Sequence, residues 1–174
     1  TGYLVAATYR YAASLEERLQ LDIRVHQPRM TAARFEALHG KTWELGPEGL
    51  EQYALAHKIE PMNRALQELG GEAWISGVRR SQSATRAGRP FAERQKRVTK
   101  LYPILDWSDG QVERYLREHD LPRHPLANAG YVTMGDWHST RPAAGDESPE
   151  STRFDGRKYE CGLHLDSGVQ DFQI

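Results

Sequence analysis

The stretch AWISGVRRSQSATR, residues 73–86, carries the strongest signal for the fold class. Residues 73–78 form a compact, mostly apolar run of strand length. Arg79 and Arg80 follow at its carboxyl end, where the parallel sheets of α/β proteins bind their ligands. Small and hydroxyl-bearing residues separate Arg80 from Arg86 and permit close approach of the backbone, and arginine forks bind phosphate or sulfate oxygens in pairs. The stretch therefore predicts a strand that ends in an anion site.

Short apolar runs and segments of helical periodicity alternate on both sides of this stretch. The predicted strands cover residues 21–25, 73–78 and 98–105. The predicted helices cover residues 14–19, 31–38, 47–57 and 61–69, and a last one that Ser108 caps. Strands separated by helices favour an α/β, Rossmann-like fold with a mainly parallel sheet and flanking helices.

Length and charge narrow the class of protein. The 174 residues are 39% hydrophobic and 27% charged, which fits a globular domain. No run approaches the roughly 20 apolar residues that span a bilayer, so we expect no membrane segment. The net charge of -1 implies no overall attraction to nucleic acid. Residues 79–100, however, hold eight lysines and arginines against Glu93 alone, which favours an anion site there; the alternative is a solvated helix face.

The single cysteine, Cys161, lies near the C-terminus in the motif Glu-Cys-Gly-Leu-His. One thiol forms no internal disulfide and binds no iron–sulfur cluster, which indicates a reducing, cytoplasmic compartment. Polar neighbours such as Lys158 and His164 would favour the thiolate, so Cys161 is a candidate nucleophile. The alternative is an inert surface thiol. We expect a domain at residues 1–142, followed by a flexible tail at residues 143–174 that carries Cys161.

Two further residues are ambiguous from their surroundings. Lys58 lies near a helix end, where lysines usually meet water or the helix dipole. His138 lies in a polar loop and could bind an anion or a sugar hydroxyl, or simply be a satisfied loop histidine. The histidines have no metal-site spacing, so no metal is expected.

Taken together, four segments resemble the phosphoadenylyl sulfate reductases of sulfate assimilation. They are Arg79–Ser83 with Arg86, the segment 58–61 that begins with Lys58, the segment 152–154 around Arg153, and above all the motif around Cys161. The resemblance extends from Thr1 to about His164. It implies an adenine nucleotide α-hydrolase-like fold, with residues 1–142 as a partial nucleotide-binding domain.

The resemblance also implies a reaction. Cys161 would attack the sulfonate sulfur of 3′-phosphoadenylyl sulfate (PAPS), and reduced thioredoxin or glutaredoxin would then release sulfite. It assigns Arg79, Arg80 and Arg86 to the nucleotide phosphates, and Lys58, Arg153 and Arg157 to the sulfonate. Tyr131 and His164 are grouped with Cys161 as catalytic residues, and His138 is grouped with the substrate-binding residues. The roles of Tyr131 and His138, which match positions near the active site, are less defined. Thioredoxin is the implied partner, and a homodimer is possible by analogy.

This sequence departs from the family pattern at two places. Iron–sulfur relatives that use adenylyl sulfate carry cysteines where this chain has Tyr53-Ala54 and residues 136–139, so we expect no cluster and favour the 3′-phosphorylated substrate. A phosphate loop that the family carries before the Thr-Gly of Thr1-Gly2 is absent. Because that loop supplies backbone N–H donors, we expect the chain alone to bind nucleotide poorly.

Three alternatives stay open at this point. The first is a cluster-free adenylyl sulfate reductase. The second is a non-catalytic, nucleotide-binding relative of the ATP sulfurylase subunit, which would not need the Cys161 motif. The third is a nucleic-acid-binding module built on residues 79–100, which the near-neutral net charge disfavours.

Overall fold

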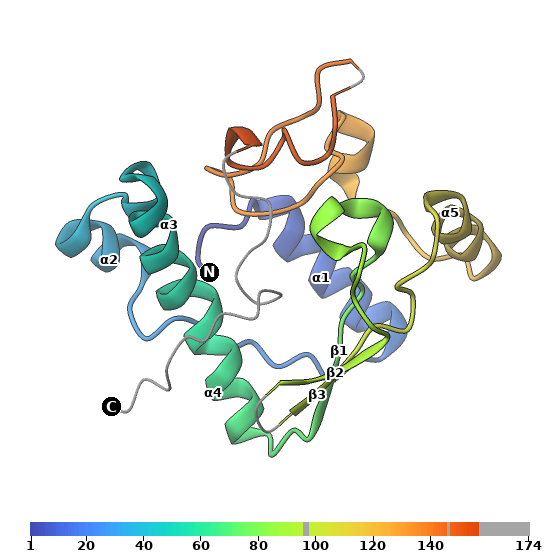
Figure 1. Cartoon of the computed structure of the whole chain (residues 1–174), viewed down its shortest axis with the longest axis horizontal. Coiled ribbons are helices and arrows are strands. Elements are labelled where there is room, and N and C mark those ends of the chain that lie inside the picture. The colour runs from blue at the N-terminus through green and yellow to red at the C-terminus, as the bar shows by residue number, and fades with distance from the viewer. Residues whose placement is uncertain (96–97, 146, 157–174) are drawn as a thin grey trace. The chain divides into compact units, whose positions relative to one another are not determined.

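The computed structural model describes residues 1–95, 98–145 and 147–156, and Figure 1 shows the path of the chain. Two compact units make up these residues. The first, which we call the helical unit, holds Thr1–Tyr3 and Arg24–Ala65. The second, the sheet unit, holds Leu4–Ile23 and the described residues from Leu66 onward. Each unit is treated below by itself.

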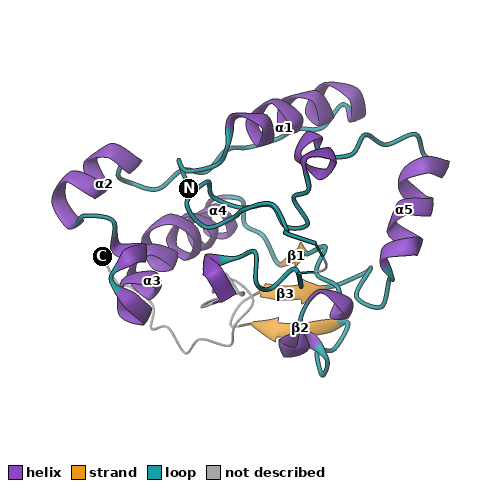
Figure 2. Cartoon of the chain, turned by 90° about the horizontal axis from the view of Figure 1, so that it is seen from above, coloured by secondary structure: helices purple, strands orange, loops and turns teal. Residues whose placement is uncertain are grey.

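The sheet unit is built on three strands, β1 (Ala73–Ile75), β2 (Ala92–Gln95) and β3 (Val98–Leu101). Strand β3 lies between the other two, as Figure 2 shows. It runs parallel to β1, with Trp74 opposite Lys100, and antiparallel to β2, with Glu93 opposite Lys100. The α/β class is confirmed, with a small mixed sheet. Strand β2 was not predicted, because nearly all of its residues are polar or charged. Its side chains alternate between more and less exposed positions, but the sequence has no matching alternation of apolar and polar residues.

Two helices belong to the sheet unit. Helix α5 (Asp109–Glu118) begins at the predicted cap, where Ser108 Oγ accepts from the Gln111 N–H at 3.2 Å and Gln111 Oε1 accepts from the Ser108 N–H at 2.8 Å. Helix α1 spans Ala6–Leu19, so the prediction that it begins at Ser14 was wrong. The Ser14 hydroxyl instead donates to the Tyr11 carbonyl inside the helix at 2.8 Å.

Helix α1 is fixed to the segment that follows α5. The hydroxyl of Thr8 lies 3.0 Å from Nε2 of His124, and the Tyr11 hydroxyl donates to the Pro122 carbonyl at 2.8 Å. Arg18 pairs with Asp120 at 2.6 Å. These bonds join residues more than a hundred positions apart, so they hold the first helix to the second half of the unit.

The prediction of a strand at residues 21–25 was wrong. These residues form no strand in the described chain, and Val25 is 74% exposed. Alternating apolar residues form a strand only where another strand's N–H and C=O groups are within reach. The described ladders leave this segment without such a partner.

The helical unit contains α2 (Ala32–His39) and most of a long helical stretch made of α3 (Gly46–Ala54), a π turn (Leu55–Ile59) and α4 (Glu60–Glu68). The last three residues of α4, from Leu66, are assigned to the sheet unit. Thr31 caps α2 and accepts a hydrogen bond from the Arg34 N–H, close to the predicted start. Rings from Tyr3, Phe35, Trp43 and Tyr53 gather around the buried His57. This aromatic cluster forms the core of the unit.

The π turn has a cause in the sequence. The Glu60 N–H bonds to the Leu55 carbonyl, five residues back. Pro61, the next residue, has no N–H, and in a regular α-helix its ring would meet the carbonyl of His57. A wider turn relieves this clash. The helix predicted at residues 61–69 is thus found as α4, within one residue, but it continues from the π turn, so Pro61 lies inside a continuous helical stretch and does not open a separate helix.

No helix among the described residues is long and apolar enough to cross a membrane.

Candidate functional site

Residues 79–89, which we call the arginine loop, follow β1 as two short 3₁₀ turns, Arg80–Gln82 and Ala84–Arg86. The side chain of Gln82 organises them, because its Oε1 accepts from the Arg79 N–H at 3.1 Å and from Nη1 of Arg86 at 2.6 Å. Arg86 is buried. The predicted anion-site arginines thus share one compact loop at the carboxyl end of β1.

Two of these arginines are anchored to the segment that follows β3. Nη1 of Arg79 donates to the Trp107 carbonyl at 3.3 Å and pairs with Asp109 at 2.7 Å. Nη1 of Arg80 pairs with Asp106. Asp106 and Asp109 were not predicted as site residues. A signal for them existed, because parallel strands end at the same edge of a sheet, and both residues follow β3.

An open hollow of about 570 Å³ lies against the arginine loop. Its lining includes Arg80, the hydroxyl-bearing Ser81, Ser83 and Ser148, and the carboxylate of Glu150. Oε1 of Glu150 accepts from the Ala84 N–H at 3.4 Å. Arg80 is the predicted anion-site arginine that lines the hollow; Arg79 and Arg86 belong to the same loop but not to this lining.

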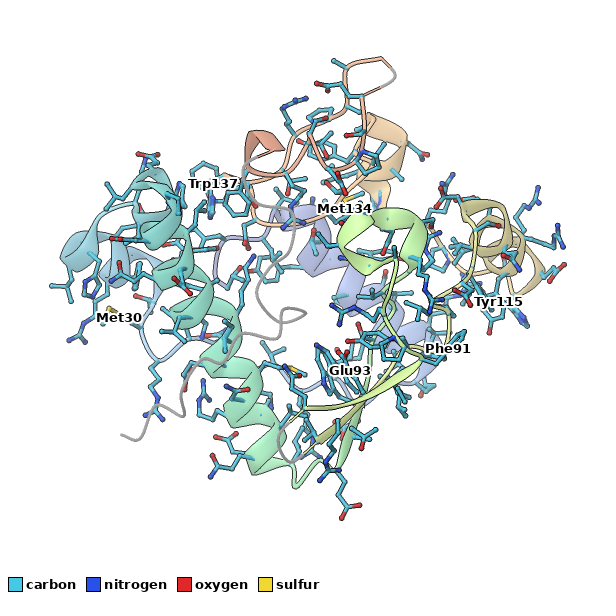
Figure 3. The ribbon with its side chains drawn as sticks, in the orientation of Figure 1. Met30, Phe91, Glu93, Tyr115, Met134 and Trp137 are labelled. Atoms are coloured by element: carbon cyan, nitrogen blue, oxygen red, sulfur yellow. The ribbon has the colours of Figure 1, made fainter. Side chains whose placement is uncertain are left out.

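A half-buried polar cluster supports the end of the arginine loop. Nη1 of Arg89 donates to Glu93 at 2.8 Å and to the Tyr102 hydroxyl at 2.7 Å, and that hydroxyl donates to Glu93 at 2.5 Å. Burial, and then the hydrogen bond to Glu93, raise the pKa of Tyr102 well above its ordinary value. Tyr102 therefore stays a neutral donor. Figure 3 labels Glu93 and Phe91 beside the sheet.

Lys100 on β3 is fully buried next to this cluster. Its Nζ lies 4.5 Å from the ring centroid of Trp74 and 5.9 Å from that of Tyr102. The positive charge is thus placed over two aromatic faces, an arrangement that stabilises a cation.

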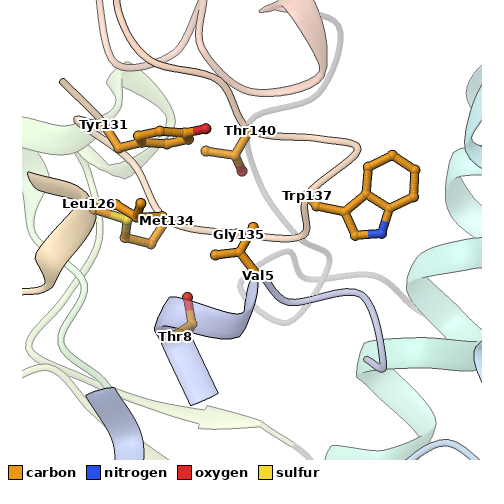
Figure 4. Close-up of a pocket in the computed structure, with 8 residues that line it drawn as sticks. All are labelled: Val5, Thr8, Leu126, Tyr131, Met134, Gly135, Trp137 and Thr140. Atoms are coloured by element: carbon orange, nitrogen blue, oxygen red, sulfur yellow. The ribbon is translucent and has the colours of Figure 1, made fainter. Parts of the chain in front are cut away.

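A second group of predicted residues surrounds Gly135. Tyr131, Gly135 and Thr140 line a small cavity of about 10 Å³, and in Figure 4 the rings of Tyr131 and Trp137 point in different directions around it. Nη1 of Arg153 donates to the Met134 carbonyl at 3.0 Å, and a β-bridge joins Arg153 to Thr140. Arg153 thus contacts Met134 and Thr140, which line this cavity together with Tyr131.

The predicted His138 belongs to this loop as well. Its ring centroid lies 5.5 Å from that of Trp137 and 6.1 Å from that of Phe154, the residue after Arg153. His138 therefore packs beside the turn that carries Arg153.

Four predicted site residues are not part of these two groups as the structure describes them. Lys58 belongs to the helical unit, on the π turn, with its Nζ 5.5 Å from the ring centroid of Tyr53. Cys161, His164 and Arg157 lie outside the described residues. Within the described ranges, no three histidine, cysteine or acidic side chains are grouped to hold a metal ion.

Comparison with known proteins shows which family this chain resembles. The family model described as "Phosphoadenosine phosphosulfate reductase domain" matches residues 1–142. A curated protein of Synechococcus sp. named phosphoadenosine 5′-phosphosulfate reductase is 53% identical over 167 residues, which cover 95% of this chain and 72% of the relative. A protein of the same name from Xylella fastidiosa is 49% identical over 164 residues, which cover 94% and 69%.

A solved structure agrees with these matches. The crystal structure of phosphoadenylyl-sulfate reductase from Candida auris, a phosphate complex, superimposes with a TM-score of 0.69 and 29% identity. The match covers 81% of this chain and 68% of the other.

Proposed function

The chain belongs to the phosphoadenosine phosphosulfate reductase family, and we propose that it reduces PAPS to sulfite and adenosine 3′,5′-bisphosphate in sulfate assimilation. The observation that carries this proposal is the family match over residues 1–142 together with the 53% identity to a named reductase. The arginine loop and its hollow are consistent with an anionic substrate.

The proposed reaction has two steps. In the first, the Cys161 thiolate attacks the sulfonate sulfur, the S–O bond to the nucleotide phosphate breaks, and its electron pair leaves with adenosine 3′,5′-bisphosphate. In the second, a dithiol protein, thioredoxin or glutaredoxin, supplies two electrons. Its thiols become a disulfide, the S–S bond of S-sulfocysteine breaks, and Cys161 is regenerated as sulfite departs.

The positive side chains have separate proposed tasks. Arg79, Arg80 and Arg86 would bind the nucleotide phosphates, since fixed cations stabilise the charge that accumulates on the leaving group. Lys58, Arg153 and Arg157 would bind the sulfonate and screen its repulsion of the thiolate. Tyr131, His138 and His164 would complete the site. The anchoring of Arg80 and Arg153 supports these roles, because a fixed guanidinium needs little reorganisation to bind an anion.

We further propose that electrons come from the dithiol protein, with no cluster bound by this chain, because Cys161 is its single cysteine. A free thiol regenerated in this way fits a cytoplasmic location. A homodimer is proposed by analogy with the family and would be recognised by the mass of the protein in solution.

Sulfite release by the full-length protein with reduced thioredoxin tests the function. We expect sulfite from PAPS, and far less from adenylyl sulfate, which lacks the 3′-phosphate. Cys161→Ser should release none and should show no sulfonate adduct by intact-protein mass. Comparable rates with both substrates would favour the adenylyl sulfate alternative, and turnover by Cys161→Ser would overturn the mechanism.

A further inference from the structure

We infer that Asp106 is a positioning residue, which orients the guanidinium of Arg80 toward the hollow so that two of its N–H groups are presented to a substrate phosphate. This inference rests on the function proposed above. It adds Asp106, which lies in a different loop from the arginines, to the substrate-binding machinery.

The hydrogen bonds of Arg80 carry the argument. Of the five N–H groups on a guanidinium, the Nε–H donates to the Ala87 carbonyl at 3.1 Å, one on Nη2 donates to the Arg89 carbonyl, and one on Nη1 binds Asp106. Among the described residues, the remaining N–H on each terminal nitrogen has no acceptor. Arg80 lines the hollow, so these two donors are available to a ligand there.

The surroundings of Arg80 hold it in this orientation. Its guanidinium carbon lies 5.4 Å from the ring centroid of Phe91, and its backbone N–H donates to the Leu105 carbonyl at 2.8 Å. The main chain and the side chain of Arg80 are therefore both tied to the residues that follow β3. Such anchoring removes rotamer freedom before the ligand arrives, so binding does not have to immobilise the side chain.

A purely electrostatic role of Asp106 would have the opposite effect on phosphate binding, so experiment can distinguish the two roles. A carboxylate beside an anion site repels phosphate, so a purely electrostatic role would make Asp106 harmful to binding. Asp106 is 55% exposed and Arg80 is 29% exposed. Removal of Asp106 therefore leaves no buried unpaired charge, and the sheet unit should stay folded.

The experiment is steady-state kinetics of Asp106→Ala in the full-length protein. We expect the KM for PAPS to rise about three- to tenfold, the factor that corresponds to one side chain losing its preorganisation. The dissociation constant for adenosine 3′,5′-bisphosphate should rise by the same factor. Asp106→Glu, which keeps the charge, should recover most of the affinity.

Glu113→Ala is the matched control. It also removes a carboxylate that pairs with an arginine, since Glu113 binds Arg123 at 2.6 Å, but this pair lies on the exposed surface and does not line the hollow. Its KM and kcat should equal those of the parent.

The double variant Arg80→Gln with Asp106→Ala tests whether the two residues act together. If Asp106 acts through Arg80, the KM of the double variant should be no higher than that of Arg80→Gln alone. An unchanged or lower KM for Asp106→Ala, or effects that multiply, would overturn the inference. If the parent itself released no sulfite, the proposed function would fail instead, and the two failures are thus distinct.

Discussion

The guanidinium of Arg153 rests against the backbone of Gly135: a Cβ atom at position 135 would lie 2.9 Å from both Cζ and Nη1 of Arg153. The same Cβ would lie 2.6 Å from Oγ1 of Thr140. Real Cβ atoms do not approach other atoms this closely, so position 135 accepts no side chain unless Arg153 or Thr140 moves.

Gly135→Ala should therefore impair sulfite release by displacing Arg153, the residue proposed to bind the sulfonate. We expect a loss of stability of about 1–3 kcal/mol from overpacking, and a fall in kcat/KM of at least tenfold. Sulfite release and chemical denaturation of the same preparation measure both effects. Gly110→Ala is the control, since its Cβ meets only Ser108 Oγ, at 3.9 Å. Parent-like kcat/KM in Gly135→Ala would show that Arg153 does not depend on this contact.

Gly49→Ala should destabilise the protein although Gly49 lies in helix α3, where alanine is intrinsically favoured by about 1 kcal/mol. The new Cβ would overlap the carbonyl oxygen of Thr42 and lie 2.9 Å from Cβ of Leu45. The clash involves backbone, so we expect a net loss of about 1–3 kcal/mol in urea unfolding. Gly110→Ala in α5 should change stability by less than about 1 kcal/mol. Equal stabilities for the two variants would contradict this packing.

His124 should make stability depend on pH. Its Nδ1 accepts from the Leu126 N–H at 3.2 Å, so the proton lies on Nε2, which faces the Thr8 hydroxyl at 3.0 Å. Burial lowers the pKa of His124 below its ordinary value of 6.5. The folded state thus favours the neutral ring, and this contribution is complete above pH 6.5 and declines as pH falls through the lowered pKa.

Unfolding measured at pH 7, 6 and 5 tests this effect. We expect the parent to lose stability over this interval more steeply than His124→Gln, which cannot titrate. The ring resonance of His124 should have its midpoint below 6.5. Parallel pH profiles for the two proteins would contradict the neutral, buried state of His124.

Glu147 should titrate far below an ordinary glutamate. Hydrogen bonds from Arg141, at 2.6 and 2.9 Å, and then from the Ala144 N–H at 2.8 Å, lower the pKa of Glu147 from 4.5 to about 2. The stability that these bonds contribute is therefore fully present above about pH 4.5 and is lost as the pH falls to about 2. Carbon-detected NMR of the carboxyl group should show this midpoint, and Arg141→Gln should move it back toward 4.5. A midpoint near 4.5 in the parent would show that the Arg141 bonds do not form in solution.

Local signals in the sequence predicted local structure well. Thr31 and Ser108 cap helices as their side chains imply, and the first half of the predicted strand at residues 73–78 forms β1 (Ala73–Ile75). Errors arose where structure depends on distant partners. Residues 21–25 alternate like a strand but have no described strand to pair with, and Pro61 distorts a helix that its position alone suggested it would begin.

The residue types and their order establish the α/β class, the loop of arginines behind a strand, and a single candidate nucleophile, because propensity, capping and composition are properties of short segments. The geometry of the site depends on folding. Arg80 meets Asp106 across 26 positions, and the Arg153 guanidinium reaches the Met134 carbonyl across 19. No local pattern encodes such pairs, since they exist only once parallel strands bring their following loops to one edge and a glycine allows close approach.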